Sequence, residues 1–163
     1  MRILVRYWPL AALLSSSAML AAAHAFETFG HLNPCTLCLR AREVYWAAIA
    51  VAAIGGALSL ASRTARAGVC VLLGLIFLGG AALAAYHAGA EWKFWSGPAS
   101  CSGGGVHVSA ADLSRLLHGG PVSAPACDKA AWVFLGLSMA AWNGLFSLGL
   151  AAASLISARE ASR

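Results

Sequence analysis

Four of the five cysteines form two pairs that are suited to thiol chemistry. Cys35 and Cys38 make a Cys-x-x-Cys motif, whose short loop stabilises a fold poorly but is common in redox pairs. Cys101 and Cys127 lie further apart, and Cys101 sits in a stretch rich in glycine and serine. The fifth, Cys70, lies within an apolar run, which predicts a buried thiol with a packing role. Disulfide exchange is therefore the first chemistry to consider.

The residues around the Cys-x-x-Cys motif favour a reactive thiolate. Asn33 and Pro34 suit the N-cap and the first position of a helix that continues into an apolar run. The positive end of the helix dipole lowers the pKa of a cysteine in the first turn. Arg42 follows Cys38 by four residues and shares its helix face, so we expect its charge to stabilise a Cys38 thiolate.

Long apolar stretches must position these cysteines. The chain is 60% hydrophobic and 10% charged, whereas an ordinary soluble domain is about 25% charged. This composition excludes disorder and favours an integral membrane protein. A helix crosses the hydrocarbon core with about 20 apolar residues, and four stretches meet this length: 7–26, 43–61, 67–89 and 131–157. We predict an all-α fold, a single membrane domain over 1–163 built as a four-helix bundle.

The distribution of charge predicts the orientation. The termini and the short turn after the second span carry arginines with a single acid, Glu160, whereas the other side mixes both signs. By the positive-inside rule, both termini are cytoplasmic and the loops 27–42 and 90–130 face outward with the two cysteine pairs. Cysteines confined to the outer side indicate the periplasm of a bacterium, so the predicted location is the inner membrane. The net charge of +5 then reflects topology, and we expect no nucleic-acid partner.

Several other interpretations of these features remain open. Residues 1–25 also resemble a cleavable signal peptide, whose loss would leave the remaining loops on the same sides. A second alternative is a structural membrane protein, in which the cysteines would form inert disulfides. A zinc site is disfavoured because Cys101 and Cys127 are far apart and the compartment is oxidising, so no metal is assigned. A transporter is disfavoured because the four spans carry no charge inside the membrane; the one charged residue in their ranges is Glu43, at the edge of the second.

Taken together, these motifs resemble the DsbB family, the membrane disulfide-bond formation proteins. The resemblance is carried by Cys-x-x-Cys followed by Arg42, by the outer cysteine pair, and by the segment 132–142 at the start of the last span. It covers about Asn33 to Ser157. One departure is Ala41, where a well-known relative has an acidic residue.

The resemblance implies a quinone-dependent protein-disulfide oxidoreductase. Such a protein reoxidises a periplasmic thioredoxin-fold oxidase, DsbA-like, and passes the electrons to ubiquinone or menaquinone in the lipid. It implies that the partner attacks Cys101 of a Cys101–Cys127 disulfide, and that Cys127 then attacks Cys35 of a Cys35–Cys38 disulfide. Cys38 would then face the quinone beside Arg42.

The same resemblance assigns a second quinone-binding residue. A histidine near the position of His87, at the outer end of the third span, is associated with the quinone site in the family. We therefore expect Arg42 and His87 to bind the cofactor. The alternative is a four-helix quinone reductase resembling vitamin K epoxide reductase, with the same cysteine logic. A short helix over Asp112–His118 is a further expectation, as a surface for the lipid or the partner.

Overall fold

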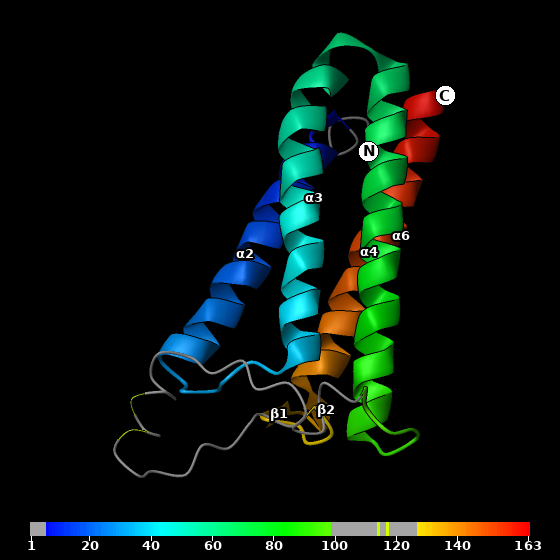
Figure 1. The fold of residues 1–163 in the computed structure, drawn as a ribbon. Helices are drawn as coiled ribbons and strands as arrows, with labels where there is room; N and C mark the ends of the chain where they lie inside the picture. Colours follow the sequence, from blue (N-terminus) through cyan, green and yellow to red (C-terminus); the bar gives the residue numbers. More distant parts are fainter. Residues whose placement is uncertain (1–5, 99–113, 115–116, 118–126) are drawn as a thin grey trace.

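The protein is a bundle of four long helices in the computed structural model, which describes residues 6–98, 114, 117 and 127–163. The helices are α2 (Trp8–Thr28), α3 (Thr36–Ala61), α4 (Arg63–Glu91) and α6 (Met139–Ser162). The start of α2, the α3–α4 turn and the end of α6 lie together at one end of the bundle (Figure 1). The chain therefore runs up and down, and the predicted all-α architecture is confirmed.

Two helix boundaries differ from the predicted spans. Helix α3 begins at Thr36, seven residues ahead of the predicted span 43–61. The prediction missed these first two turns because they carry charged residues and do not belong to the apolar stretch. Arg40 and Glu43 in these turns form an ion pair of 3.0 Å on the exposed surface. At the other end only Ser62 separates α3 from α4, and its hydroxyl caps α4 by accepting a hydrogen bond from the Ala65 N–H.

The last helix begins at Met139, and the prediction of a span from 131 differs from the structure there. Strand β1 (Val133–Phe134) pairs antiparallel with β2 (Leu137–Ser138). The two residues between the strands both have positive φ, 52° at Leu135 and 79° at Gly136, as a tight hairpin turn requires. Ser138 then caps α6 through a hydrogen bond from the Ala141 N–H.

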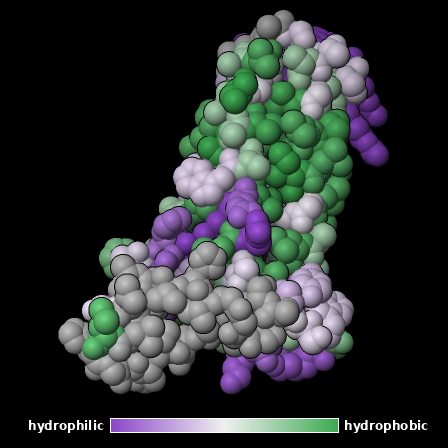
Figure 2. Space-filling view, in the orientation of Figure 1, coloured by the Kyte–Doolittle hydropathy of each residue, from purple (hydrophilic) through white to green (hydrophobic). Residues whose placement is uncertain are grey.

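The surface of the bundle is apolar where lipid would cover it. Helices α2, α4 and α6 are each long and apolar enough to cross a membrane. Large side chains such as Leu14, Ile54 and Leu75 are more than half exposed, and hydrophobic surface covers much of the body of the bundle (Figure 2). The chain is therefore a multi-pass membrane protein. The crossing of α3 at 43–61 and the compartment at each end stay predictions.

Small residues let the helices approach closely. Helix α4 packs mainly against α3 and α6, and α2 packs mainly against α3. Ala48, Ala84 and Ala151 are buried between these helices, as is typical of membrane interfaces. Cys70 is a free thiol buried in α4, in keeping with the packing role expected from the sequence.

Candidate active site

Cys35 occupies the N-cap of α3, two residues later than the cap predicted at Asn33. Its backbone is extended (φ −77°, ψ 171°), and its Sγ accepts a hydrogen bond from the Cys38 N–H at 3.4 Å. The helix therefore begins at Thr36, and Pro34 lies before it. A sulfur in this place meets unpaired N–H groups and the positive end of the helix dipole. The predicted helix start at the motif is confirmed, and the predicted capping residue, Asn33, is wrong.

The two thiols of the motif lie in contact. Cys35 Sγ and Cys38 Sγ are 3.2 Å apart, and both cysteines are free. The pair is thus in its dithiol form, and a disulfide needs the sulfurs to approach to about 2.05 Å. Cys35 is buried, whereas Cys38 is only partly buried.

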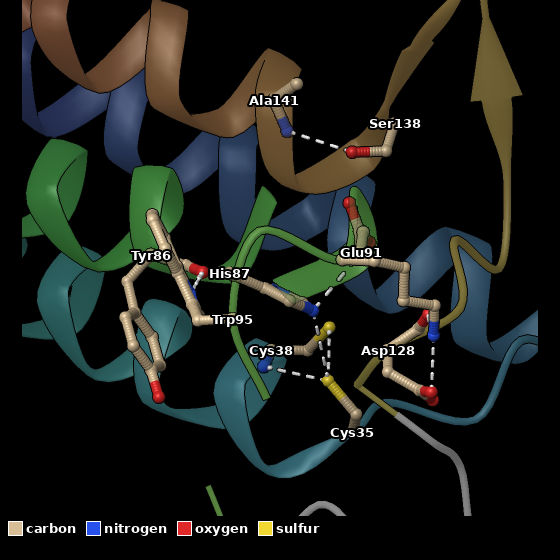
Figure 3. Close-up of polar contacts among 10 residues, drawn as sticks. Cys35, Cys38, Tyr86, His87, Glu91, Trp95, Asp128, Ser138 and Ala141 are labelled. Atoms are coloured by element: carbon tan, nitrogen blue, oxygen red, sulfur yellow. Dashed lines mark hydrogen bonds and ion pairs between the residues drawn. The ribbon is translucent and has the colours of Figure 1, made fainter. Parts of the chain in front are cut away.

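Helix α4 brings a histidine and a carboxylate to these thiols (Figure 3). His87 Nε2 lies 3.6 Å from Cys35 Sγ and 3.7 Å from Oε1 of Glu91. Both side chains are buried, 8% and 5% exposed, and Glu91 Oε2 has no hydrogen-bond partner within the part of the chain that the structure describes. Glu91 was missed from the sequence, although its spacing of four residues from His87 places the two on one helix face.

The contacts of Cys35 favour its ionised form. The hydrogen bond with the Cys38 thiol lowers the pKa of Cys35 well below its usual range, and the hydrogen bond and charge of His87 act in the same direction, against the effect of burial. The same hydrogen bond raises the pKa of Cys38, which keeps its proton. From the sequence we expected the thiolate on Cys38. In this dithiol form the negative charge belongs to Cys35, since Cys35 has both partners.

Arg42 is engaged differently from the expectation. Its Nη1 donates to Oε2 of Glu27 at 2.7 Å, and its Nη2 donates to the Ala23 carbonyl at 3.3 Å. The pair ties the first turns of α3 to the end of α2, with 15% of the Arg42 side chain exposed. Its charged partner is therefore Glu27, not a Cys38 thiolate. Sequence reasoning overlooked Glu27, because nothing local links residues so far apart in the chain.

A cavity of about 430 Å³ opens beside these residues. Cys38, Arg42 and His87 line it together, so the structure gathers both predicted quinone-binding residues around one thiol. The rest of the lining is mainly apolar and aromatic, and it includes Leu20, Phe26, Trp132, Phe134, Met139, Trp142 and Phe146. A quinone headgroup is a flat apolar ring with two carbonyl oxygens. The cavity fits such a group in size and in its few polar donors.

A polar network in the cavity wall was not predicted. The Tyr45 hydroxyl donates to Oδ1 of Asn143 at 2.5 Å and lies 3.0 Å from the Ser147 hydroxyl. Tyr45 and Asn143 both line the cavity. The amide nitrogen of Asn143 is left as a further donor there, because no residue in the described ranges is bonded to it. A single polar residue within an apolar span is the sequence signal for such a site.

Cys127 comes close to the inner thiols. It is fully buried, disulfide-bonded, and part of one hydrophobic cluster with Cys35 and Leu37. The next residue, Asp128, is held by Lys93 at the end of α4 through its carbonyl at 2.7 Å and its carboxylate at 2.5 Å. This contact holds the pKa of Asp128 below its usual value.

Two expectations for the long loop fall largely outside the described residues. Cys101 lies there, and so does the segment Asp112–His118 apart from Ser114 and Leu117.

Comparison with known proteins agrees with this geometry. The profile of the family described as "Disulfide bond formation protein DsbB" matches residues 5–157. The chain belongs to the DsbB family. A relative from Methylococcus capsulatus named "Disulfide bond formation protein B" is 31% identical over 157 residues, covering 92% of each protein. No solved structure matches the chain. The resemblance seen in the sequence is thus confirmed, and a DsbB-family member is a disulfide-forming oxidoreductase of the membrane.

Proposed function

We propose that this DsbB-family protein oxidises a periplasmic, DsbA-like dithiol protein and passes two electrons through its cysteine pairs to a membrane quinone. The observation that carries the proposal is that Cys35 and Cys38 have different surroundings. Cys35 is a buried member of the cluster that holds Cys127, whereas Cys38 packs against that cluster and also lines the cavity, which Cys35 does not. One member of the inner pair thus faces the outer loop, and the other faces a site for an apolar acceptor.

The outer pair would receive the electrons. Cys35, Cys38 and Cys70 are free and Cys127 is disulfide-bonded, which supports Cys101 as its partner. A thiolate of the partner protein attacks Cys101, forms a mixed disulfide and releases the Cys127 thiolate. The second thiol of the partner then displaces Cys101. One disulfide has formed in the partner and one has been reduced here, so two electrons have moved.

The inner pair would take these electrons by a second exchange. The Cys127 thiolate attacks Cys35, so that the Cys35–Cys38 bond breaks, a Cys35–Cys127 bond forms and Cys38 leaves as a thiolate. Cys101 then attacks Cys127 and releases Cys35. While Cys35 is bonded to Cys127 it carries no charge, and the negative charge lies on Cys38 at the cavity. The end product, with Cys127 bonded and Cys35 and Cys38 as thiols, has the cysteine states described above.

The cavity residues would hold the acceptor. A bound quinone supplies an acceptor for two electrons and two protons as the inner disulfide forms again. Arg42 donates hydrogen bonds with a planar guanidinium that Glu27 keeps in place, and His87 donates from the opposite helix. The aromatic and aliphatic lining keeps water away from the Cys38 sulfur.

The two alternatives predict different behaviour of the inner cysteines. In a structural protein the pairs would resist mild reductant, whereas here two thiols lie in contact beside a cavity and a histidine. A quinone reductase resembling vitamin K epoxide reductase would use the same cysteines on another substrate. The family match supports a disulfide-forming role over this second alternative.

The decisive experiment is turnover with purified components. Purified protein in detergent is mixed with a reduced thioredoxin-fold dithiol protein and either ubiquinone or menaquinone, and both the quinone absorbance and the partner thiols are followed. We expect one quinone to be consumed per partner disulfide over many turnovers. Cys38→Ser should abolish quinone consumption, and Cys70→Ala should turn over normally as the matched control. A partner that stays reduced in excess quinone would refute the function.

A further inference from the structure

We propose that the dithiol form of the inner pair is a zinc site, with Cys35, Cys38, His87 and Glu91 as the four ligands. The inference concerns metal binding by the reduced protein. It adds to the proposed electron transfer and does not depend on it.

The first support for the zinc site is the arrangement of its donor atoms. The two sulfurs and a ring nitrogen of His87 all lie within 4.8 Å of one another. The sulfurs are 3.2 Å apart, and Cys35 Sγ is 3.6 Å from His87 Nε2. In a tetrahedral site with Zn–S of about 2.3 Å and Zn–N of about 2.0 Å, adjacent donors are separated by about 3.5–3.8 Å. Small side-chain movements therefore convert the observed cluster into a zinc site.

Glu91 supplies the second, independent observation. Its side chain is 5% exposed, and its Oε2 has no hydrogen-bond partner in the described part of the protein. Its Oε1 lies 3.7 Å from His87 Nε2, the atom that faces Cys35 (Figure 3). A buried carboxylate oxygen without a partner is costly, so it points to a missing cation. A carboxylate is also a normal zinc ligand. The group of donors within 4.8 Å holds the two sulfurs and His87, so Glu91 completes a set of two sulfurs, one nitrogen and one oxygen by turning its carboxylate toward the sulfurs.

The balance of charge favours the same ion. On binding, the Cys35–Cys38–His87 cluster gives up two protons, one of them from the Cys38 thiol, and Zn²⁺ replaces them, so the net charge of the buried cluster does not change. Thiolate and imidazole donors select zinc or cobalt over magnesium and calcium, which prefer oxygen ligands. No metal was predicted from the sequence, because Cys101 and Cys127 are far apart and the loop histidines have no partner at a usable spacing. The structure instead combines one cysteine pair with two residues of α4.

The site exists only in the reduced protein. A disulfide has no thiolate to offer, so the oxidised inner pair cannot bind the ion. Bound zinc would in turn hold both sulfurs and oppose the return of the Cys35–Cys38 disulfide. Zinc is thus expected to trap the protein with its electrons on the inner pair.

Metal binding can be measured without quinone or partner. The protein is reduced in detergent, freed of reductant under anaerobic conditions, and titrated with Zn²⁺ against a chromophoric chelator and with Co²⁺ as a coloured probe. We expect one ion per chain and a sulfur-to-cobalt charge-transfer band, with neither in the oxidised protein. Cys38→Ser should abolish tight binding, and Glu91→Gln should weaken it about tenfold or more. Cys70→Ala and His24→Gln are matched controls and should bind normally.

The outcomes separate this inference from the proposed function. Equal binding by oxidised and reduced protein, or binding unaffected by Cys38→Ser, would mean an adventitious ion only and would overturn the site. Unchanged affinity in Glu91→Gln would overturn the four-ligand arrangement. Turnover assays on the same preparations with a chelator present test the function by itself. Added Zn²⁺ should inhibit that turnover, and the chelator should restore it.

Discussion

The sulfur of Cys35 lies 3.6 Å from Nε2 of His87, so residues from two different helices meet at the thiol that caps α3. Cys35 also belongs to the buried cluster that contains Cys127. The contact with Cys35 gives His87 a role in the inner pair itself, in addition to the cavity wall that it also lines.

Removing the imidazole should make Cys35 less acidic. His87 and the Cys38 thiol both lower the pKa of Cys35, so the wild-type thiolate persists below the ordinary thiol pKa of about 8.5 and is lost only as the pH falls through its depressed value. In His87→Ala we expect the pH profile of Cys35 alkylation to move upward by about one unit or more. Mass spectrometry of the reduced protein, with chelator present, resolves Cys35 from the other thiols.

A neighbouring substitution provides the control for that profile. Tyr86→Phe changes the residue before His87 but leaves the Tyr86 carbonyl, which accepts the Trp95 indole hydrogen bond at 3.0 Å. Its alkylation profile should match the wild type. An unchanged profile in His87→Ala would show that the imidazole does not act on Cys35.

Cys38→Ser should capture the inner exchange as a stable adduct. Without Cys38, a disulfide between Cys35 and Cys127 has lost one of the thiols that resolve it, and the two residues already share a buried cluster. In this variant the Cys35 thiolate attacks Cys127 of the Cys101–Cys127 disulfide, that bond breaks and Cys101 leaves as a thiolate. We expect the cross-link to accumulate in protein kept free of reductant and of reduced partner, and to be found by non-reducing peptide mapping. Cys35→Ser should leave no such species. A cross-link from Cys127 to Cys38 in that variant would reverse the assigned roles.

Arg42→Ala should impair the quinone step and spare the exchange with the partner. A hydrogen bond to a charged group contributes about 1.5–3 kcal/mol, so we expect turnover to fall by about tenfold or more and the quinone requirement to rise. Arg42→Lys should recover only part, because an ammonium lacks the planar fork. The measurement is a quinone titration beside a separate assay of the Cys101 mixed disulfide.

Substitution of Glu27 tests whether Arg42 acts through its exact position or only through its charge. Glu27→Gln keeps a hydrogen-bond acceptor near the guanidinium but removes the ion pair of 2.7 Å. We expect a smaller loss than in Arg42→Ala, seen mainly in the quinone requirement. Wild-type kinetics in both Arg42 variants would remove Arg42 from the cofactor site.

The parts of the fold that rest on local patterns could be predicted from the sequence. The length of the apolar stretches predicted the helices, and Asn33 and Pro34 predicted a helix start at Cys35 and Cys38. The hairpin at 133–138 could not be predicted, because a short apolar run fits a strand and a helix equally well. The turn through Gly136 decides between them there.

The contacts of the site depend on tertiary structure. Arg42 shares a helix face with Cys38, yet its nearest acid comes from another helix, Glu27. Glu91 was missed because a charge at the end of an apolar run looks like an ordinary interfacial residue, and only the packed bundle shows that it is buried beside His87. Local spacing therefore found the reactive atoms, and packing determined their partners.

Two adjacent glycines in α4 should respond in opposite ways to a single methyl group. A Cβ at Gly80 would lie 2.9 Å from Cγ1 of Val44 in α3 and 3.5 Å from the Ser147 hydroxyl in α6, whereas a Cβ at Gly79 would meet nothing within 4 Å. Val44 is β-branched and has little freedom to turn away. We expect Gly80→Ala to destabilise the bundle by about 1–3 kcal/mol through overpacking.

Gly79→Ala is the matched control, because it adds the same methyl group to the same helix. Alanine favours a helix over glycine by about 1 kcal/mol, so this variant should be as stable as the wild type or more stable. Thermal unfolding of both variants in one detergent, followed by helical circular dichroism, gives the comparison. If Gly80→Ala melts at or above the temperature of Gly79→Ala, then α3, α4 and α6 do not meet as closely at this point as the structure has them. In Gly80→Ala the displacement of Val44 should also disturb the cavity, because Val44 follows the cavity-lining residue Arg42 by two residues in α3.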